Sequence, residues 1–193
     1  IYEKVMYDGN THFSIGSIKA IREYVITVNG VSKSYAMTGW RIGYAAGPHY
    51  VMEAAAKVQT QVTSNANSIA QKATVAALMG PTMEIHAMVD EFKRRRDFVY
   101  EKLSAIHDVT VALPDGAFYF LFDVSKFYGK KSQKHVIRNS TDMGTYLLDH
   151  HHVASVPGIA FGDDNCLRIS YACSMAELEK GMERLRRGLE TLG

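Results

Sequence analysis

The sequence has few cysteines, no long apolar run and little excess charge, and each of these shortages excludes a class of protein. Only Cys166 and Cys173 occur, and their odd separation within one apolar stretch directs them to opposite faces of a strand, so we expect no mutual disulfide and a reducing compartment. No stretch reaches the roughly 18 apolar residues of a membrane span. Lys and Arg number 22 against 20 Asp and Glu, a balance that does not predict a nucleic-acid or anionic membrane surface. We therefore expect a cytoplasmic protein whose partner is a small molecule.

The composition that remains is that of a globular protein. Of the 193 residues, 47% are apolar and 22% are charged, which is enough to bury a sizeable core. The chain begins at Ile1, and residues 1–7 read as the middle of a strand and turn without a charged leader. We expect a fragment that lacks part of its own site.

The first part of the chain predicts helices packed on a sheet. Residues 23–29 and 40–46 are short β-branched or aromatic runs, which predict two strands on either side of a loop. Apolar residues at helical spacing follow in residues 50–62 and 68–79, and a Gly-Pro pair ends the second pattern. The order of strand, loop, strand and helix is typical of an α/β layer.

One long helix is predicted over residues 82–106, and short strands mixed with helices are predicted after it. The basic run KRRR at residues 93–96 is interpreted as a solvated face of this helix rather than a nucleic-acid site. Four strands and two helices are predicted beyond it: strands at 109–112, 117–123, 153–156 and 166–172, and helices at 141–150 and 175–192. We therefore predict three parts, a first domain at 1–82, a connecting helix at 83–105 and a small α+β domain at 106–193.

Lys33 is the strongest candidate for covalent chemistry. A nucleophilic lysine must sit where an aldehyde can reach it, and Lys33 lies just beyond a predicted strand in a stretch of small and polar residues. Arg41 follows eight residues later, and a guanidinium at the start of a strand can clamp a phosphate with two charge-assisted hydrogen bonds. The spacing alone equally allows a surface lysine and a surface arginine near a turn.

The residues around Lys33 resemble a known signature. The segment GVSKSYAMTGWRIG at residues 30–43 resembles, position by position, the pyridoxal-phosphate attachment sequence of class I aminotransferases. The resemblance implies that Lys33 carries pyridoxal 5′-phosphate as a Schiff base and shuttles a proton, and that Arg41 holds the phosphate. Some branches of the family have a phosphate-binding serine where this chain has Gly30, and Ser32 is a weak substitute.

The resemblance extends to both ends of the chain. Tyr2, in the segment IYEK, looks like the family tyrosine that donates a hydrogen bond to the phenolic oxygen of the cofactor. Arg168, in NCLRISYA, resembles the arginine that binds the substrate α-carboxylate. An arginine within an apolar strand needs an anionic partner, so it is a site candidate without the family as well. Its other reading is an edge-strand arginine that bridges to Asp163 or Asp164.

Three further segments look like family landmarks, and one histidine run does not. Residues 63–68, 114–119 and 157–162 resemble family segments, and the last two are expected to form walls around the substrate. Three consecutive histidines at 150–152 point in different directions at a helix end, so we expect helix capping there and no metal.

The resemblance implies a fold and a reaction. The fold is the carboxyl-terminal part of a pyridoxal-phosphate-dependent transferase, with the end of the large sheet domain, a connecting helix and a small domain. The reaction is transamination between an amino acid, with aspartate expected, and a 2-keto acid, with 2-oxoglutarate expected, in a homodimer. Two alternatives stay open: a lyase or synthase of the same fold, such as a carbon–sulfur lyase, and a non-catalytic fragment or dimerisation module. We expect little activity from these residues alone, because the family's ring-pairing aspartate and stacking aromatic are not among them.

Overall fold

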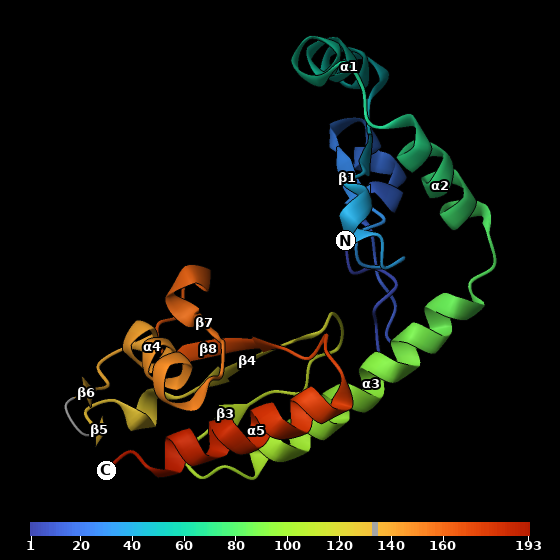
Figure 1. The fold of residues 1–193 in the computed structure, drawn as a ribbon. Helices are drawn as coiled ribbons and strands as arrows, with labels where there is room; N and C mark the ends of the chain where they lie inside the picture. Colours follow the sequence, from blue (N-terminus) through green and yellow to red (C-terminus); the bar gives the residue numbers. More distant parts are fainter. Residues whose placement is uncertain (133–134) are drawn as a thin grey trace. The chain divides into compact units, whose positions relative to one another are not determined.

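The computed structural model describes residues 1–132 and 135–193, which form two compact units (Figure 1). The first unit is Ile1–Val89 and the second is Asp90–Gly193. The boundary falls inside helix α3 (Met83–Ser104), within the helix that the sequence predicts as a connection. The finer division into 1–82, 83–105 and 106–193 stays a prediction. Each unit is described by itself.

The first unit contains a two-stranded sheet, three short 3-10 helices and two α-helices before α3. In chain order the elements are η1 (Ile15–Ser17), η2 (Lys19–Tyr24), β1 (Thr27–Gly30), η3 (Thr38–Trp40), β2 (Gly43–Ala46), α1 (His49–Thr63) and α2 (Ser68–Met79). Both α-helices agree with the predicted patterns. Both strands are shorter than predicted, because the residues expected to begin them lie in the 3-10 helices η2 and η3.

The sheet of the first unit brings the two ends of the Lys33 loop together. Strands β1 and β2 are antiparallel, with Thr27 opposite Ala46 and Gly30 opposite Gly43. A Cβ placed on Gly30 would lie 3.1 Å from the carbonyl oxygen of Ile42, so this pair of strands has little room for a side chain there. The loop between the strands, residues 31–42, is therefore closed at its base by a backbone ladder.

Helix α2 has clear start and stop signals in the sequence. The Asn67 side chain accepts hydrogen bonds from the backbone N–H of Ile69 at 2.9 Å and of Ala70 at 3.1 Å, which satisfies two donors that the first turn leaves open. The helix ends at Met79, where Gly80 takes an extended conformation ahead of Pro81. These local signals explain why its predicted bounds agree with the observed ones.

The buried core of the first unit is small. Its buried apolar residues are Val5, Tyr7, Val31, Ala70 and Ile85. Helix α1 has none, although its apolar residues recur at helical spacing. Amphipathic spacing predicts a helix correctly, but only a packing partner buries its apolar face.

The second unit is built on a four-stranded antiparallel sheet in the order β3-β4-β8-β7. Its elements after α3 are β3 (Thr110–Val111), β4 (Tyr119–Asp123), η4 (Ser125–Phe127), β5 (Lys131–Ser132), β6 (His135–Val136), α4 (Ser140–His151), β7 (Val156–Pro157), η5 (Gly158–Phe161), β8 (Cys166–Ser170) and α5 (Met175–Glu190). Strands β5 and β6 form a separate pair. The predicted α+β character of this region is observed.

The two faces of the central strands differ in burial. Phe120, Phe122 and Leu167 point to one face and are 0–1% exposed. Helix α3 covers that face, since the rings of Tyr100 and Phe120 stack at 6.5 Å between centroids. Side chains alternate along a strand, so Arg168 and its cross-strand neighbours belong to the opposite face. The candidate site residue Arg168 therefore lies on the face of the sheet opposite helix α3.

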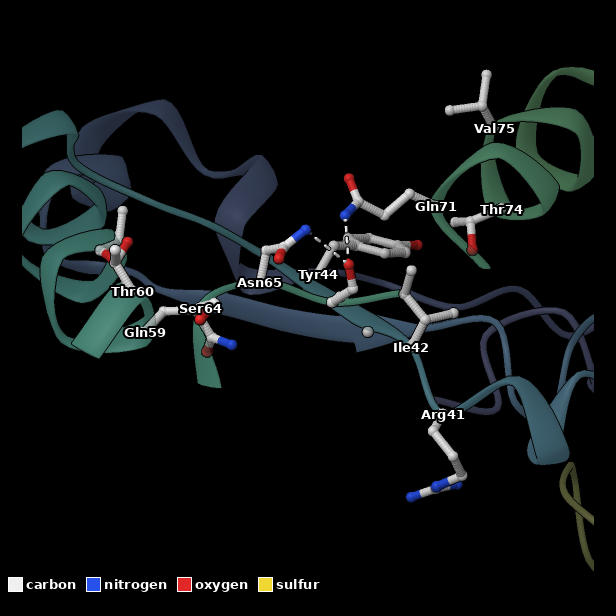
Figure 2. Close-up of a pocket in the computed structure, with 13 residues that line it drawn as sticks. Arg41, Ile42, Tyr44, Gln59, Thr60, Ser64, Asn65, Gln71, Thr74 and Val75 are labelled. Atoms are coloured by element: carbon white, nitrogen blue, oxygen red, sulfur yellow. Dashed lines mark hydrogen bonds between the residues drawn. The ribbon is translucent and has the colours of Figure 1, made fainter. Parts of the chain in front are cut away.

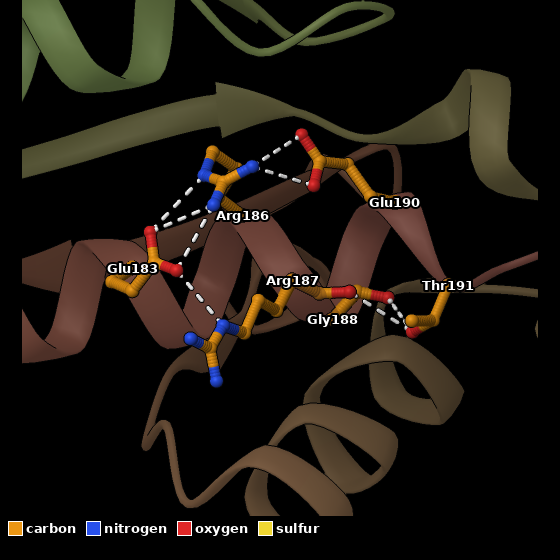
Figure 3. Close-up of polar contacts among 6 residues, drawn as sticks. All are labelled: Glu183, Arg186, Arg187, Gly188, Glu190 and Thr191. Atoms are coloured by element: carbon orange, nitrogen blue, oxygen red, sulfur yellow. Dashed lines mark hydrogen bonds and ion pairs between the residues drawn. The ribbon is translucent and has the colours of Figure 1, made fainter.

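Helix α5 places its apolar stripe against the core and its charges outside. Leu178, Met182, Leu185 and Leu189 are buried. On the outer face Arg186 pairs with both Glu183 and Glu190, and Arg187 Nε donates to Glu183 at 2.8 Å (Figure 3). Exposed pairs of this kind contribute about 0.3–0.5 kcal/mol each. Burial of the apolar stripe therefore fixes this helix more than its ion pairs do.

The basic run on α3 is only partly a solvated face, and the prediction is wrong for its last residue. Arg94 is exposed and pairs with Glu91, and Lys93 is half-buried and pairs with Asp97. Arg96 is 1% exposed, and its Nη1 donates to the carbonyl oxygen of Pro114 at 3.1 Å. Arg96 follows Phe92 by four residues and precedes buried Val99 by three, so helical spacing places it on the core side of the helix.

The cysteines, the histidine run and the long helices can each be compared with the expectations from sequence. Cys166 and Cys173 are free thiols, the first buried and the second exposed. His152 is the left-handed C-cap of α4, and its neighbour His151 hydrogen-bonds through Nε2 to the Tyr146 hydroxyl at 2.9 Å. Within residues 1–132 and 135–193, no three His, Cys, Asp or Glu side chains are grouped to hold a metal ion. No helix in the part of the chain that the structure describes is long and apolar enough to cross a membrane.

Candidate functional site

Lys33 lies in a tight turn that is fixed on both sides. Its neighbours Val31 and Ser34 are buried, whereas Lys33 itself is half-buried. The backbone N–H of Tyr35 donates to Val31 at 3.2 Å, and that of Ala36 donates to the Lys33 carbonyl at 3.3 Å. Ala36 has a φ of 52°, a left-handed conformation that costs a non-glycine residue about 1 kcal/mol. The turn therefore holds the lysine on a defined backbone rather than on a loose loop.

The start of the chain packs against this turn. The Ser34 hydroxyl donates to the carbonyl oxygen of Ile1 at 3.4 Å, and the Ile1 side chain also reaches the Cβ position of Gly30. Tyr2, the next residue, is half-buried. The structure thus brings the segment that carries Tyr2 beside the turn that carries Lys33.

Arg41 is linked to the same turn through Thr38. The Thr38 hydroxyl donates to the Ser32 carbonyl at 3.0 Å, and Arg41 Nη1 donates to the Thr38 carbonyl at 2.9 Å. Arg41 is exposed and left-handed, with a φ of 50°. No carboxylate among the described residues forms an ion pair with it. An oriented guanidinium without a protein counter-ion suits an anionic ligand such as a phosphate.

A cavity of about 750 Å³ opens beside Arg41 (Figure 2). Its walls come from β2, the end of α1, the connection to α2, and α2 itself. Figure 2 shows Asn65 and Gln71 converging beside the ring of Tyr44; both side-chain amides donate to the Ala66 carbonyl, at 3.1 and 2.7 Å. The lining residues are Arg41, Ile42, Gly43, Tyr44, Ala56, Gln59, Thr60, Ser64, Asn65, Ala66, Gln71, Thr74 and Val75. Arg41 is the one charged group in that lining, so the cavity favours an anion.

Tyr44 remains protonated in this setting. Burial raises the pKa of its phenol, and the nearby Glu3 and Tyr35 raise the pKa further. The hydroxyl is therefore a neutral hydrogen-bond donor in the cavity at physiological pH. The sequence alone does not indicate this role, because a tyrosine within a predicted strand is expected to pack its ring against neighbouring side chains.

Gly30 occupies the position where some family branches have a phosphate-binding serine. The backbone of β2 crowds this position: the Cα of Gly43 and the carbonyl oxygen of Ile42 lie 3.3 and 3.1 Å from a placed Cβ. This close approach gives a physical reason for glycine. Among the neighbouring residues of this loop, Ser32 is the predicted source of a hydroxyl in place of the missing serine.

Arg168 lies in the second unit, on the central strand β8. It pairs with Leu121 of β4 on one side and with Val156 of β7 on the other. Its guanidinium carbon lies 4.5 Å from the ring centroid of Tyr119 and 4.1 Å from that of Phe161. Arg168 is therefore half-buried between aromatic side chains on the open face of the sheet.

The alternative reading of Arg168, an ion pair with Asp163 or Asp164, is wrong. Asp163 accepts from the Asn165 backbone at 3.0 Å and from the Cys166 thiol at 3.3 Å. Asp164 accepts from the Ser140 hydroxyl at 2.5 Å at the start of α4. Both carboxylates are occupied in holding loops, and no ion pair to Arg168 occurs within the described residues.

The Asp163 neighbourhood is structural rather than nucleophilic. Burial raises the pKa of the Cys166 thiol to about 12, and the hydrogen bond to Asp163 raises it too. A thiol with that pKa is protonated at neutral pH and does not act as a nucleophile. Cys166 is therefore not a candidate for covalent chemistry.

Comparison with known proteins agrees with this geometry. Residues 1–185 match the family model described as aminotransferase class I and II. A bifunctional aspartate aminotransferase and glutamate/aspartate-prephenate aminotransferase of Petunia hybrida is 45% identical over 197 residues, covering 100% of this chain and 41% of that protein. An aspartate aminotransferase of Rhizobium meliloti strain 1021 is 44% identical, covering 100% and 47%.

Solved structures give the same result. A structure of the aspartate aminotransferase from Rhizobium meliloti superposes with a TM-score of 0.96 at 43% identity, covering 100% of this chain and 49% of that one. The Thermus thermophilus aspartate aminotransferase with maleate has a TM-score of 0.83 at 39% identity, covering 97% and 46%. The chain thus spans about half the length of the relatives that it matches.

These matches identify the class of protein. The chain belongs to the class I and II aminotransferase family. This family depends on pyridoxal phosphate, and the predicted α/β fold of such an enzyme is confirmed over about half of the relatives' length. Lys33, Arg41 and the polar cavity fit that cofactor, because they supply an amine on a fixed turn and a guanidinium that no carboxylate of the described residues neutralises.

Proposed function

We propose that this protein transfers an amino group between aspartate and 2-oxoglutarate with pyridoxal phosphate bound at Lys33. The observation that carries the proposal is the hydrogen-bonded series Ser32, Thr38 and Arg41 around a fixed lysine turn, in a chain whose relatives are named aspartate aminotransferases. The names of those relatives favour transamination over a lyase of the same fold.

Lys33 has two tasks in this proposal. Its amine would hold the cofactor in place. The same amine would take the proton from the substrate Cα and give it up again as the amino group is transferred, and would reverse this transfer for the second substrate. The cofactor, when bound, supplies the electron sink that makes the Cα proton acidic.

Three other residues of the first unit would hold the cofactor. Arg41 presents donors to the phosphate, since only one of its nitrogens is engaged by Thr38. Tyr2 donates a hydrogen bond to the phenolic oxygen from the segment beside the Lys33 turn. Ser32 is a secondary phosphate contact, and its carbonyl is already fixed by Thr38.

Arg168 is proposed to bind the α-carboxylate of the substrate. It carries a positive charge that no carboxylate among the described residues neutralises. The Thermus thermophilus relative was solved with maleate, a dicarboxylate. A carboxylate ligand supplies the anionic partner that a half-buried guanidinium requires.

The whole protein is proposed to act in the cytoplasm as a homodimer, without nucleic acid or membrane. Residues 1–82 belong to the large cofactor-binding domain, 83–105 to a connecting helix and 106–193 to the small domain. Helix α1, whose residues are all at least partly exposed, is available for contacts that the relatives' further length or a second copy would provide.

The test is oxaloacetate formation from aspartate and 2-oxoglutarate by the full protein saturated with pyridoxal phosphate. Lys33→Arg keeps the charge but lowers kcat by at least about a hundredfold, because a guanidinium neither holds the aldehyde nor moves the proton. Lys4→Arg, an exposed lysine near the start of the chain, is the matched control. Full activity in Lys33→Arg would rule out the assignment. Repeated release of pyruvate, ammonia and thiol from a β-thio-substituted amino acid, without any keto acid acceptor, would indicate a carbon–sulfur lyase.

A further inference from the structure

We propose that Tyr119 and Phe161 form an aromatic clamp that orients Arg168 and sets its affinity for carboxylates. The proposal rests on the proposed function of Arg168 as the carboxylate site. It adds two positioning residues, from different elements, that act through the arginine. The two residues are called the aromatic clamp below.

The clamp contacts Arg168 without using its hydrogen-bond donors. The guanidinium carbon lies 4.5 Å from the Tyr119 ring centroid and 4.1 Å from the Phe161 ring centroid, both within the usual limit of about 6 Å for a cation over a ring. Contact with a ring face leaves the N–H groups at the guanidinium edge available. A carboxylate binds that edge with two parallel hydrogen bonds.

The register of the sheet places Tyr119 correctly for this contact. Leu121 is directly opposite Arg168, and Tyr119 is opposite Ser170, so Tyr119 is the diagonal neighbour of Arg168 on the same face. Diagonal neighbours lie roughly 7–8 Å apart, which an aromatic ring and a long arginine side chain can span.

The backbone just before Tyr119 is anchored. The Tyr171 N–H donates to the Phe118 carbonyl at 3.0 Å, and the Tyr171 hydroxyl donates to the Ala117 carbonyl at 3.0 Å. Buried Arg96 holds the Pro114 carbonyl at the beginning of the same segment. Tyr119 therefore has a fixed starting position for its ring.

Phe161 reaches Arg168 from a different element because Gly158 lets the chain fold closely over β8. A Cβ on Gly158 would overlap the carbonyl oxygens of Asp163 and Cys166. The Asp163 N–H donates to the Gly158 carbonyl at 3.1 Å, which closes the turn around η5. This short helix ends at Phe161, which is 46% exposed, whereas Tyr119 is half-buried.

The arrangement replaces the usual carboxylate partner of a half-buried arginine. Asp163 and Asp164 are committed to backbone and side-chain groups of their own loops. The rings stabilise the cation without neutralising its charge, so the site keeps its attraction for an external anion. A protein carboxylate in the same place would compete with the substrate.

The test is equilibrium binding of maleate to the cofactor-loaded full protein, measured by titration calorimetry. Phe161→Leu and Tyr119→Leu are each expected to weaken binding by about 2- to 5-fold, since a partly exposed cation–ring contact has that strength. The KM for aspartate should rise by a similar factor, with kcat changed less than about twofold. Phe161→Tyr keeps a ring and should restore the affinity.

Phe98→Leu is the matched control, because it removes another ring that contacts a cation, Lys102 at 5.5 Å, on helix α3 of the same unit. It should bind maleate like the unchanged protein. Equal maleate affinity in Phe161→Leu, Phe161→Tyr and Phe98→Leu would overturn the clamp. Because Phe161 is substantially exposed, its variants should fold. The Phe161 variants therefore test the clamp even when Tyr119→Leu lowers the yield of folded protein.

The Arg168→Ala variant separates the clamp from the function on which it rests. Loss of maleate binding in Arg168→Ala supports the carboxylate site, and the clamp variants then report on positioning alone. Unchanged binding in Arg168→Ala would mean that the carboxylate assignment is wrong. An Arg168-dependent affinity that is insensitive to both rings would mean that only the clamp is wrong.

Discussion

Replacing Arg96 is predicted to destabilise the second unit far more than replacing any other member of the basic run. Its guanidinium is almost completely buried, donates to the Pro114 carbonyl at 3.1 Å and pairs with Asp97 at 2.7 Å. Arg96→Met preserves much of the side-chain volume but removes a hydrogen bond from a charged donor and leaves the Pro114 carbonyl without that donor. Because Pro114 is only partly buried and water can reach it, these losses correspond to about 1.5–3 kcal/mol in the free energy of unfolding.

Arg94→Met is the matched control for that experiment. Arg94 lies on the same helix and pairs with Glu91, but its side chain is 59% exposed, so its removal should cost less than about 0.5 kcal/mol. Urea unfolding followed by circular dichroism at 222 nm gives both values. Equal costs for the two variants would refute the view that burial, rather than charge, makes Arg96 important.

The Arg96→Met variant should also differ from the unchanged protein in how its stability depends on pH. Burial alone would raise the pKa of Asp97, but hydrogen bonds from Arg96 and Lys93 outweigh it and lower the pKa overall. A carboxyl with a lowered pKa adds stability above its unfolded pKa, near 3.9, and loses it as the pH falls. As the pH falls through this range, Arg96→Met should therefore lose less of its free energy of unfolding than the unchanged protein does.

Two further predictions concern helix ends. Asn67→Ala should destabilise the first unit by about 1 kcal/mol, because two backbone donors of α2 lose their acceptor, and Asn67→Ser should recover most of it in thermal unfolding. For His151, burial lowers the pKa and the neighbouring His150 and His152 lower it further, so the unfolded state binds protons more readily. Stability of the second unit should fall as the pH drops below about 6.5, and His151→Gln should reduce that dependence; an unchanged profile would contradict the assignment.

The helices and the order of elements were predictable because their signals are local. The Asn67 cap and the Gly-Pro stop define α2, and apolar spacing over residues 82–106 defines most of α3. The Lys33 loop was found from its neighbours in sequence, and the structure closes it with a two-stranded ladder. Residue roles at this loop stay predictions until they are tested chemically.

The contacts that were missed are long-range. Helical spacing places Arg96 on the same face as Phe92 and Val99, but its acceptor Pro114 is 18 residues away and cannot be identified from the local pattern. The sequence indicated that residues 114–119 and 157–162 line a site, but not that Tyr119 and Phe161 both contact Arg168. Such pairings depend on sheet register and on the close turn at Gly158, which become visible only once the strands are aligned.

The most direct test of the account is to find the residue that holds the cofactor. The full protein is incubated with pyridoxal phosphate, reduced with borohydride and digested, and the modified peptide is sequenced by mass spectrometry. The account predicts one stoichiometric label on Lys33, lost in Lys33→Arg and retained in Lys4→Arg. A label on another lysine, or equal labelling of several lysines, would contradict it.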